Sequence, residues 1–174
     1  MIHFDSERPA EAAAREDLLD RVMGRARQFK PSERLRRGRR PAEGLALVAR
    51  NDDGSLVGTV RLWHVKAGDA PALLLGPLAV DKGVQSEGVG SSLMRLAIAR
   101  AGAIGHAGII LVGDPEYYER FGFSADRTSG LLMPAPVDRR RFLGLELKAK
   151  ALVDASGMIV AAGQTVPVAE QLAA

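Results

Sequence analysis

The chain has 174 residues, of which 47% are hydrophobic and 26% are charged, and it contains no cysteine. This composition predicts one globular domain over residues 1–174 and excludes disordered chains, disulfide-stabilised folds, thiolate metal sites and cysteine nucleophiles. Because the net charge is only +3 and aromatic residues make up 5%, we expect no nucleic-acid partner. The first residues lack the pattern of a secretory leader and no apolar run could span a membrane, so we expect a cytoplasmic protein without a membrane partner.

A helix and a β-hairpin are predicted in the N-terminal third of the chain. Apolar residues at positions 18, 19, 22, 23 and 26 recur at helical spacing after Pro9 and indicate an amphipathic helix that packs on a sheet. Residues 45–49 and 56–63 are strand-like, and the turn-forming residues 51–54 join them.

Arginines cluster in two places along the chain. The two runs are Arg34, Arg36, Arg37, Arg39 and Arg40, and Arg139, Arg140 and Arg141. Either run could meet an anionic group, such as an acidic acceptor or a phosphate, or could form a solvated basic surface. We expect the solvated surface and keep anion binding as the alternative.

The centre of the chain has the pattern of a strand, a glycine-rich loop, a helix and a second strand. Residues 73–80 are apolar on both faces, as in a central strand, but Gly76–Pro77 should interrupt the ladder with a bulge. A helix is predicted from Ser91 to Ala103, and residues 108–112 form a strand that returns parallel to the first through a right-handed crossover. Bulges often border active sites, so we expect the function to lie here.

The C-terminal third is predicted to hold a short helix, a strand and a frayed tail. Residues 115–121 form the helix, with Asp114 as its cap and Gly122 at its end. Residues 142–147 are a further strand and residues 154–157 form a turn, whereas residues 164–174 show no periodicity and are expected to fray.

The loop from Gln85 to Ser92 is a candidate phosphate site. A glycine-rich turn that opens a helix presents free backbone N–H groups and the positive end of the helix dipole to an anion. Leu93 stands where the dinucleotide fingerprint needs a third glycine, and residues 89–90 lack the Lys and Ser or Thr of a P-loop, so neither family fits. A tight helix entry without a ligand is the alternative.

Three segments in this region resemble the GNAT acetyltransferases. Residues 75–80 are similar to the family's bulged fourth strand, residues 85–90 to its pyrophosphate motif, and residues 117–123 to its aromatic-Tyr-x-x-x-Gly-Phe segment. The resemblance implies an α/β (α+β) fold with a mixed, mostly antiparallel sheet, flanking helices and a splayed parallel pair of central strands. Ser86 and Glu87 depart from the commonest motif, and an acid there should weaken pyrophosphate binding unless its side chain points to solvent.

The resemblance also implies a reaction, the transfer of an acetyl group from acetyl-CoA, as cosubstrate, to a primary amine by direct attack. The Val80 N–H would donate to the thioester carbonyl, and Tyr118, with an ordinary pKa of about 10, would protonate the leaving thiolate as general acid. Without the resemblance, the aromatic residues 117–123 would be interpreted as a packing cluster. The implied cofactor-binding residues are Leu78, Ala79, Val80, Gln85, Ser86, Glu87, Gly88, Val89, Gly90, Ser91 and Ser92.

The sequence identifies neither the acceptor nor the general base. Asp114, Glu116, Glu43 and Glu146 have suitable chemistry for a base, as has a chain of waters. The acceptor could be a small molecule, a peptide or a protein. The alternative function is a CoA-binding sensor or partner-binding module on the same scaffold.

Other chemistries fit the sequence less well. His3, His64 and His106 are far apart and form no local ligand pair, so no metal is expected. Residues 88–92 do not form the G-x-S-x-G elbow of a serine hydrolase. A homodimer through the C-terminal segment is a further expectation.

Overall fold

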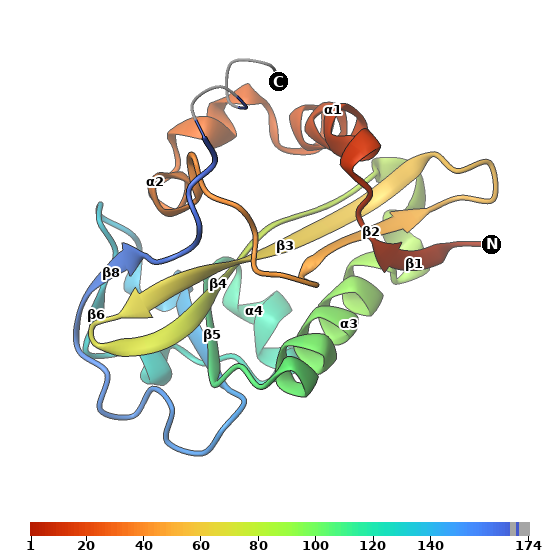
Figure 1. Cartoon of the computed structure of the whole chain (residues 1–174). Helices are drawn as coiled ribbons and strands as arrows, with labels where there is room; N and C mark the ends of the chain where they lie inside the picture. The colour runs from red at the N-terminus through yellow and green to blue at the C-terminus, as the bar shows by residue number, and fades with distance from the viewer. Residues whose placement is uncertain (168–169, 171–174) are drawn as a thin grey trace.

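The computed structural model describes residues 1–167 and 170, which form an eight-stranded sheet with helices on both faces (Figure 1). The strand order is β1-β2-β3-β4-β5-β7, and β8 pairs with both β3 and β6. The strands are β1 (His3–Ser6), β2 (Ala46–Arg50), β3 (Leu56–Ala67), β4 (Ala70–Val80), β5 (Gly108–Val112), β6 (Leu131–Leu132), β7 (Phe142–Glu146) and β8 (Gly157–Ala161). The α-helices are α1 (Ala12–Met23), α2 (Glu33–Arg36), α3 (Val89–Ile104) and α4 (Pro115–Tyr118).

Short 3₁₀ segments connect several of these elements. They are η1 (Pro9–Glu11), η2 (Arg25–Phe29), η3 (Lys82–Glu87), η4 (Glu119–Phe121), η5 (Ala125–Thr128) and η6 (Arg139–Arg141). Two of them, η2 and η3, lead into α2 and α3.

The sheet is mixed and mostly antiparallel, which confirms the predicted fold class. Along the main strand order, only β4 and β5 run parallel to each other, and α3 forms the crossover between them. The hairpin of β2 and β3, the strand β7 and the short helix α4 also lie where the sequence predicts them. Asp114 caps α4 by accepting a hydrogen bond from the Glu116 N–H, and Gly122 ends the following turn in the left-handed region, with φ 91°.

Local backbone chemistry moves the ends of two predicted helices. The first helix ends at Met23 because Gly24 adopts a φ of 74°, so Ala26 lies outside it. The helix predicted from Ser91, which is α3, begins at Val89, directly after Gly88, which has a φ of 74°. The sequence also missed β1, α2 and β6, which have at most four residues each and are too short to show a period.

Apolar side chains on the two faces of the sheet hold the helices in place. Leu93 and Met94 of α3 are fully buried with the sheet residues Leu47 and Leu62 in one cluster. On the opposite face, Leu18 of α1 packs with Val48 and Leu56. Figure 1 shows the result, with α1 and α2 on one side of the sheet and α3 and α4 on the other.

The start of the predicted frayed tail is held in place by backbone hydrogen bonds. The Gln164 carbonyl accepts from the Arg40 N–H at 2.8 Å, and the Val166 N–H donates to the Gly38 carbonyl at 2.8 Å. Within this predicted tail, residues 164–166 pair with the chain around residue 39. Most of the remaining tail, residues 168–169 and 171–174, lies outside the described residues.

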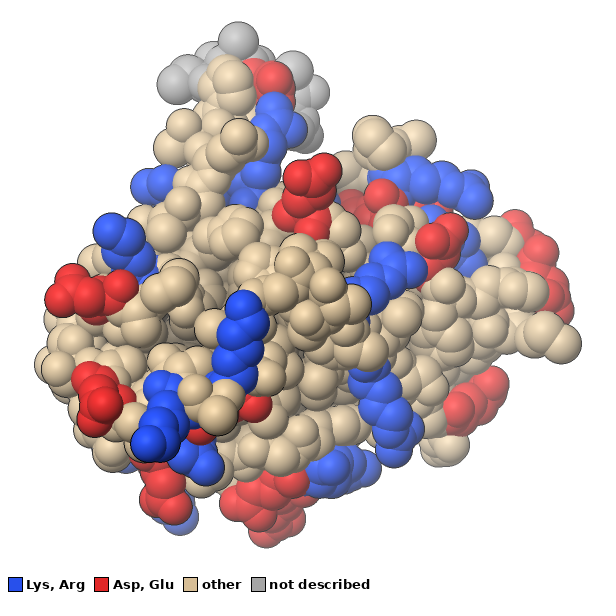
Figure 2. Space-filling view, turned by 60° about the horizontal axis from the view of Figure 1, so that its bottom comes forward, with Lys and Arg blue, Asp and Glu red and all other residues tan. Residues whose placement is uncertain are grey.

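Charge is spread over the surface. Figure 2 shows Lys and Arg interspersed with Asp and Glu on the face that it presents. In the second arginine run, Arg139 donates to the Leu131 and Thr128 carbonyls, Arg140 pairs with Asp138, and Arg141 donates to a backbone carbonyl. Within the described part of the chain, no helix is long and apolar enough to cross a membrane.

Candidate active site

The bulge predicted in β4 is present at Gly76–Pro77. The pairing of β4 with β3 shifts by one residue between Leu78 and Leu75. The buried indole N–H of Trp63 donates a 2.6 Å hydrogen bond to the Gly76 carbonyl, which fixes the bulged backbone.

Beyond the bulge, β4 and β5 separate. Their parallel pairing is limited to residues 73–74 of β4 and 109–110 of β5. Nevertheless β4 continues to Val80, and β5 to Val112. The carboxyl ends of these two strands therefore form the open V that the family resemblance implied, at the edge of the sheet where ligands bind in α/β folds.

The inner edge of this V carries free backbone groups of β4. The Asp81 N–H donates to the Val57 carbonyl of β3 at 2.8 Å. Because N–H groups alternate between the two sides of a strand, Ala79 also faces β3, whereas Leu78 and Val80 point away from β3 into the gap. Two of the three predicted strand residues therefore present N–H groups to a ligand in the gap.

The glycine-rich loop follows directly and leads into α3. Gln85, Ser86 and Glu87 lie in η3, and residues 89–92 form the first turn of α3. No side chain caps this helix, so the N–H groups of residues 89–91 stay available to an anion, whereas the Ser92 N–H donates to the Gly88 carbonyl at 3.0 Å. Glu87 is exposed, which meets the condition under which an acid is tolerated beside a pyrophosphate.

Gly90 has a steric role that the sequence did not reveal. A Cβ atom at this position would lie 2.8 Å from the Tyr117 hydroxyl and 3.4 Å from the Val80 side chain. A larger residue would therefore push α4 or the end of β4 away from the helix start. The first turn of α3, the end of β4 and α4 thus meet at one glycine.

Tyr118 reaches the same gap from the end of α4. Its ring lies on Gly113, where a Cβ atom would come within 2.3 Å of the ring carbon Cε2. Burial, and to a smaller extent Tyr117, raise the pKa of Tyr118 to about 12, whereas Arg141 acts in the opposite direction. The hydroxyl therefore keeps its proton throughout the neutral range, more firmly than the ordinary value used in the sequence interpretation.

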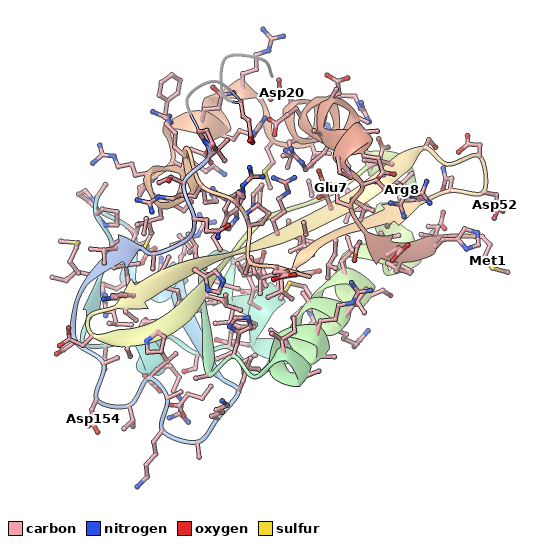
Figure 3. The ribbon with its side chains drawn as sticks, in the orientation of Figure 1. Met1, Glu7, Arg8, Asp20, Asp52 and Asp154 are labelled. Atoms are coloured by element: carbon pink, nitrogen blue, oxygen red, sulfur yellow. The ribbon has the colours of Figure 1, made fainter. Side chains whose placement is uncertain are left out.

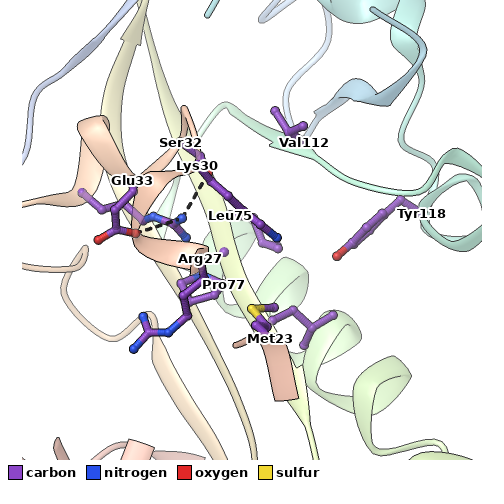
Figure 4. A pocket seen from close by; sticks show the side chains of 12 residues that line it. Met23, Arg27, Lys30, Ser32, Glu33, Leu75, Pro77, Val112 and Tyr118 are labelled. Carbon is purple, nitrogen blue, oxygen red and sulfur yellow. Dashed lines mark hydrogen bonds and ion pairs between the residues drawn. The ribbon is translucent and has the colours of Figure 1, made fainter. Parts of the chain in front are cut away.

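A cavity of about 80 Å³ opens beside Tyr118, on the side of α1 and α2 (Figure 4). Figure 4 shows the Tyr118 hydroxyl pointing into it, with Glu33 on the opposite side. The cavity is lined by Met23, Arg27, Lys30, Ser32, Glu33, Arg36, Leu75, Gly76, Pro77, Leu78, Val112 and Tyr118. It joins the candidate acid to the free edge of β4, which is where an acceptor for the reaction would have to enter.

A network of ion pairs lies beside this cavity, between α1 and the sheet, and reaches its wall at Arg27. The Glu7 carboxylate, which Figure 3 shows between α1 and the sheet, accepts two hydrogen bonds from Arg61, at 2.8 and 2.6 Å. Glu7 also pairs with Arg15 at 2.9 Å. Arg27 pairs with Glu16 and, at 3.0 Å, with Asp20. These side chains come from α1, η2, β3 and the residue that follows β1, so no local sequence motif indicates that they lie together.

The four carboxylates considered as a base lie elsewhere. Asp114 is occupied as the α4 cap, and Glu146 accepts from the Leu152 N–H and pairs with Arg127. Neither they nor Glu43 and Glu116 line the Tyr118 cavity. Glu33 is the carboxylate that does, and sequence reasoning missed it because it stands within a basic run.

Two of the three histidines approach each other in space. The rings of His64 and His106 are 5.4 Å apart, although the residues are distant in sequence. Among the described residues, no group of three or more potential metal ligands occurs.

Comparisons with known proteins find similarity to acetyltransferases. The family described as acetyltransferase (GNAT) domain matches residues 42–125. The uncharacterized N-acetyltransferase YhbS of Escherichia coli K12 is 29% identical over 117 residues, which cover 66% of this chain and 70% of that protein.

Solved structures with a similar fold include CoA-bound ones. The crystal structure of YhbS from Escherichia coli in complex with CoA has a TM-score of 0.77 and 26% identity, covering 92% of this chain and 89% of that one. A GNAT family acetyltransferase from Brucella melitensis in complex with acetyl-CoA has a TM-score of 0.62 and 28% identity, covering 83% and 96%.

Proposed function

The chain belongs to the GNAT acetyltransferase family, and we propose that it transfers the acetyl group of acetyl-CoA to a primary amine by direct attack in the V between β4 and β5. The observation that carries this proposal is the separation of the two parallel strands next to the half-buried hydroxyl of Tyr118. An extended ligand with amide groups can pair with the free edge of β4, and its phosphates can meet the first turn of α3.

In this proposal, some residues bind the cosubstrate and others take part in the transfer. Leu78 and Val80 hold the extended arm of the cosubstrate, and the Val80 N–H donates to the thioester oxygen as negative charge develops there. Residues 85–92 hold the pyrophosphate, chiefly through backbone N–H groups. The amine forms the new bond to the acetyl carbon, the carbon–sulfur bond breaks, and Tyr118 gives its proton to the sulfur.

The raised pKa of Tyr118 bears on this role. A phenol with a pKa of about 12 is fully protonated at neutral pH and can therefore act only as an acid, not as a base, before the transfer. The proton lost by the amine must leave by another route. Glu33 lines the cavity, but it is paired with Arg36 at 3.2 Å, so we assign the base to no residue.

The proposal is tested by the release of thiol from acetyl-CoA in the presence of a panel of amines. Turnover that depends on an added amine is the expected result. Tight binding of acetyl-CoA without turnover of any amine would instead support the non-catalytic alternative, a CoA-binding sensor or partner-binding module. The placement of Tyr118 at the cavity argues against that alternative.

A further inference from the structure

The acceptor cavity contains a buried arginine with unused hydrogen-bonding capacity. Arg36 of α2 is 7% exposed, yet its guanidinium has five N–H donors to satisfy. Its Nη2 atom contacts Ser32 at 3.0 Å and Glu33 at 3.2 Å. Its Nε atom is buried without any hydrogen-bond partner, and Nη1 makes no hydrogen bond within the described part of the chain. A buried charged donor left in this state is costly, so a ligand that accepts from it gains affinity.

This arginine lies against the reactive strand. Its Nη1 atom is 3.3 Å from the position that a Cβ atom of Gly76 would occupy. Gly76 and Leu78 both line the cavity and are two residues apart along β4, on either side of Pro77. An acceptor whose amine lies at Leu78 and Tyr118 therefore needs a chain of only a few bonds to place a second group at the Arg36 guanidinium.

The charge balance of the cavity favours an anion at that point. Its lining includes three cations, Arg27, Lys30 and Arg36, and one carboxylate, Glu33. Arg27 is neutralised by Glu16 and Asp20, whereas Lys30 makes no ion pair within the described residues. Burial lowers the pKa of Arg36, Glu33 raises it and Arg27 lowers it, which shows that one carboxylate does not fully compensate the desolvated charge.

From this geometry we infer that the acceptor is a small amine that also carries a carboxylate, with the amine at Leu78 and Tyr118 and the carboxylate at Arg36, assisted by Lys30. This inference rests on the proposed function and adds the substrate class. A carboxylate is planar and singly charged, so it matches one guanidinium, whereas a phosphate dianion calls for more positive charge than the cavity offers, because Arg36 already pairs with Glu33 and Arg27 with Glu16 and Asp20. The cavity of about 80 Å³ limits the acceptor to a small one.

The other arginines of the same run provide the contrast. Arg34 is exposed, donates to the Pro134 carbonyl at 3.4 Å and does not line the cavity. Arg39 and Arg40 bond to Gly163 and Glu170 near the C-terminus. Arg37 is exposed and donates to the Gln28 carbonyl at 3.1 Å. Arg36 is thus the arginine of this run that lines the cavity, and Arg34→Gln is a matched control on the same helix.

The experiment compares ω-amino acids of increasing length with their carboxamides as acceptors for thiol release from saturating acetyl-CoA. We expect kcat/KM of the best carboxylate to exceed that of its amide by at least about tenfold, a typical effect of a charged hydrogen bond. Arg36→Gln should bring this ratio close to one, Arg36→Lys should retain part of it, and Arg34→Gln should leave it unchanged. Circular dichroism checks that each variant is folded, and Lys30→Gln, at an exposed position, serves as the second variant, with a smaller loss.

Two results would overturn the inference. One is a wild-type enzyme that uses the amides as well as the acids; the other is a preference for acids that survives in Arg36→Gln and Arg36→Lys. Both leave acetyl-CoA binding and amine-dependent thiol release in place, so they are distinct from failure of the proposed function. If no member of the series turns over, calorimetry with CoA-loaded protein decides, because the N-acetylated acid must bind more tightly than its amide, and equal binding contradicts the inference.

Discussion

The cosubstrate side and the acceptor side of the cleft present different groups of the protein to their ligands. On the cosubstrate side, the V and the start of α3 offer backbone N–H groups, and glycine allows the elements to approach. On the acceptor side, the cavity wall includes charged side chains from η2 and α2, and Arg27 among them forms ion pairs with α1. The cosubstrate side depends on the path of the backbone, whereas the acceptor side depends on which side chains the fold brings together. Substitutions should therefore affect binding and turnover differently on the two sides.

The largest effect is expected at the point where the two sides meet. Tyr118→Phe removes the acid but keeps the ring on Gly113, so kcat should fall by roughly 10²–10⁴ while acetyl-CoA affinity hardly changes. Steady-state kinetics and calorimetry measure the two quantities separately. Tyr117→Phe is the neighbouring control and should lose much less. Unchanged kcat in Tyr118→Phe would remove this residue from the mechanism.

On the cosubstrate side, Gly90→Val should weaken acetyl-CoA binding by about 100-fold, or roughly 2.8 kcal/mol. The added side chain collides with the Tyr117 hydroxyl, 2.8 Å from the Cβ position. The matched control is Gly102→Ala in the same helix, where the added Cβ meets nothing within 4 Å. That control should bind normally and unfold at a slightly higher temperature, because alanine favours the helix. Normal affinity in Gly90→Val would contradict the role of the loop.

On the acceptor side, the buried ion pairs should matter for folding. Arg27→Gln removes a buried partner of Glu16 and Asp20, which keep only Arg15 and the exposed Arg25. It should lower the free energy of unfolding by about 2 kcal/mol, with Glu16 half exposed and thus partly screened. Arg25→Gln is the control, since that side chain is 91% exposed and should change stability by less than ~0.5 kcal/mol. Urea denaturation measures both. Equal stability of the two variants would mean that the network is not structural.

A smaller and more specific effect concerns alkaline pH. Because the pKa of Tyr118 is about 12 in the folded protein and about 10 in an unfolded chain, its contribution to stability is present below pH 10 and is lost as the pH rises towards 12. Phenolate absorbance should show a component with a midpoint near 12 that is missing in Tyr118→Phe. A wild-type titration without that component would show that the ring is not desolvated.

The same contrast explains what could be predicted from the sequence. The bulge at Gly76–Pro77, the loop at residues 85–92 and the Asp114 cap follow from local backbone rules, and the structure has the bulge and the cap in place. Glu33 and Arg36 could not be assigned, because their importance comes from packing against a strand about forty residues away in sequence. Gly90 and Gly113 were likewise missed as contacts of Tyr117 and Tyr118, since a sequence does not show which side chain lies over a glycine.

The central claim is that the V and the loop at residues 85–92 bind acetyl-CoA. Isothermal titration of the wild-type protein with acetyl-CoA and, separately, with NAD tests it most directly. The account predicts a dissociation constant in the micromolar range for acetyl-CoA, about −8 kcal/mol, and no binding of NAD. Absence of acetyl-CoA binding, or equal binding of NAD, would contradict it.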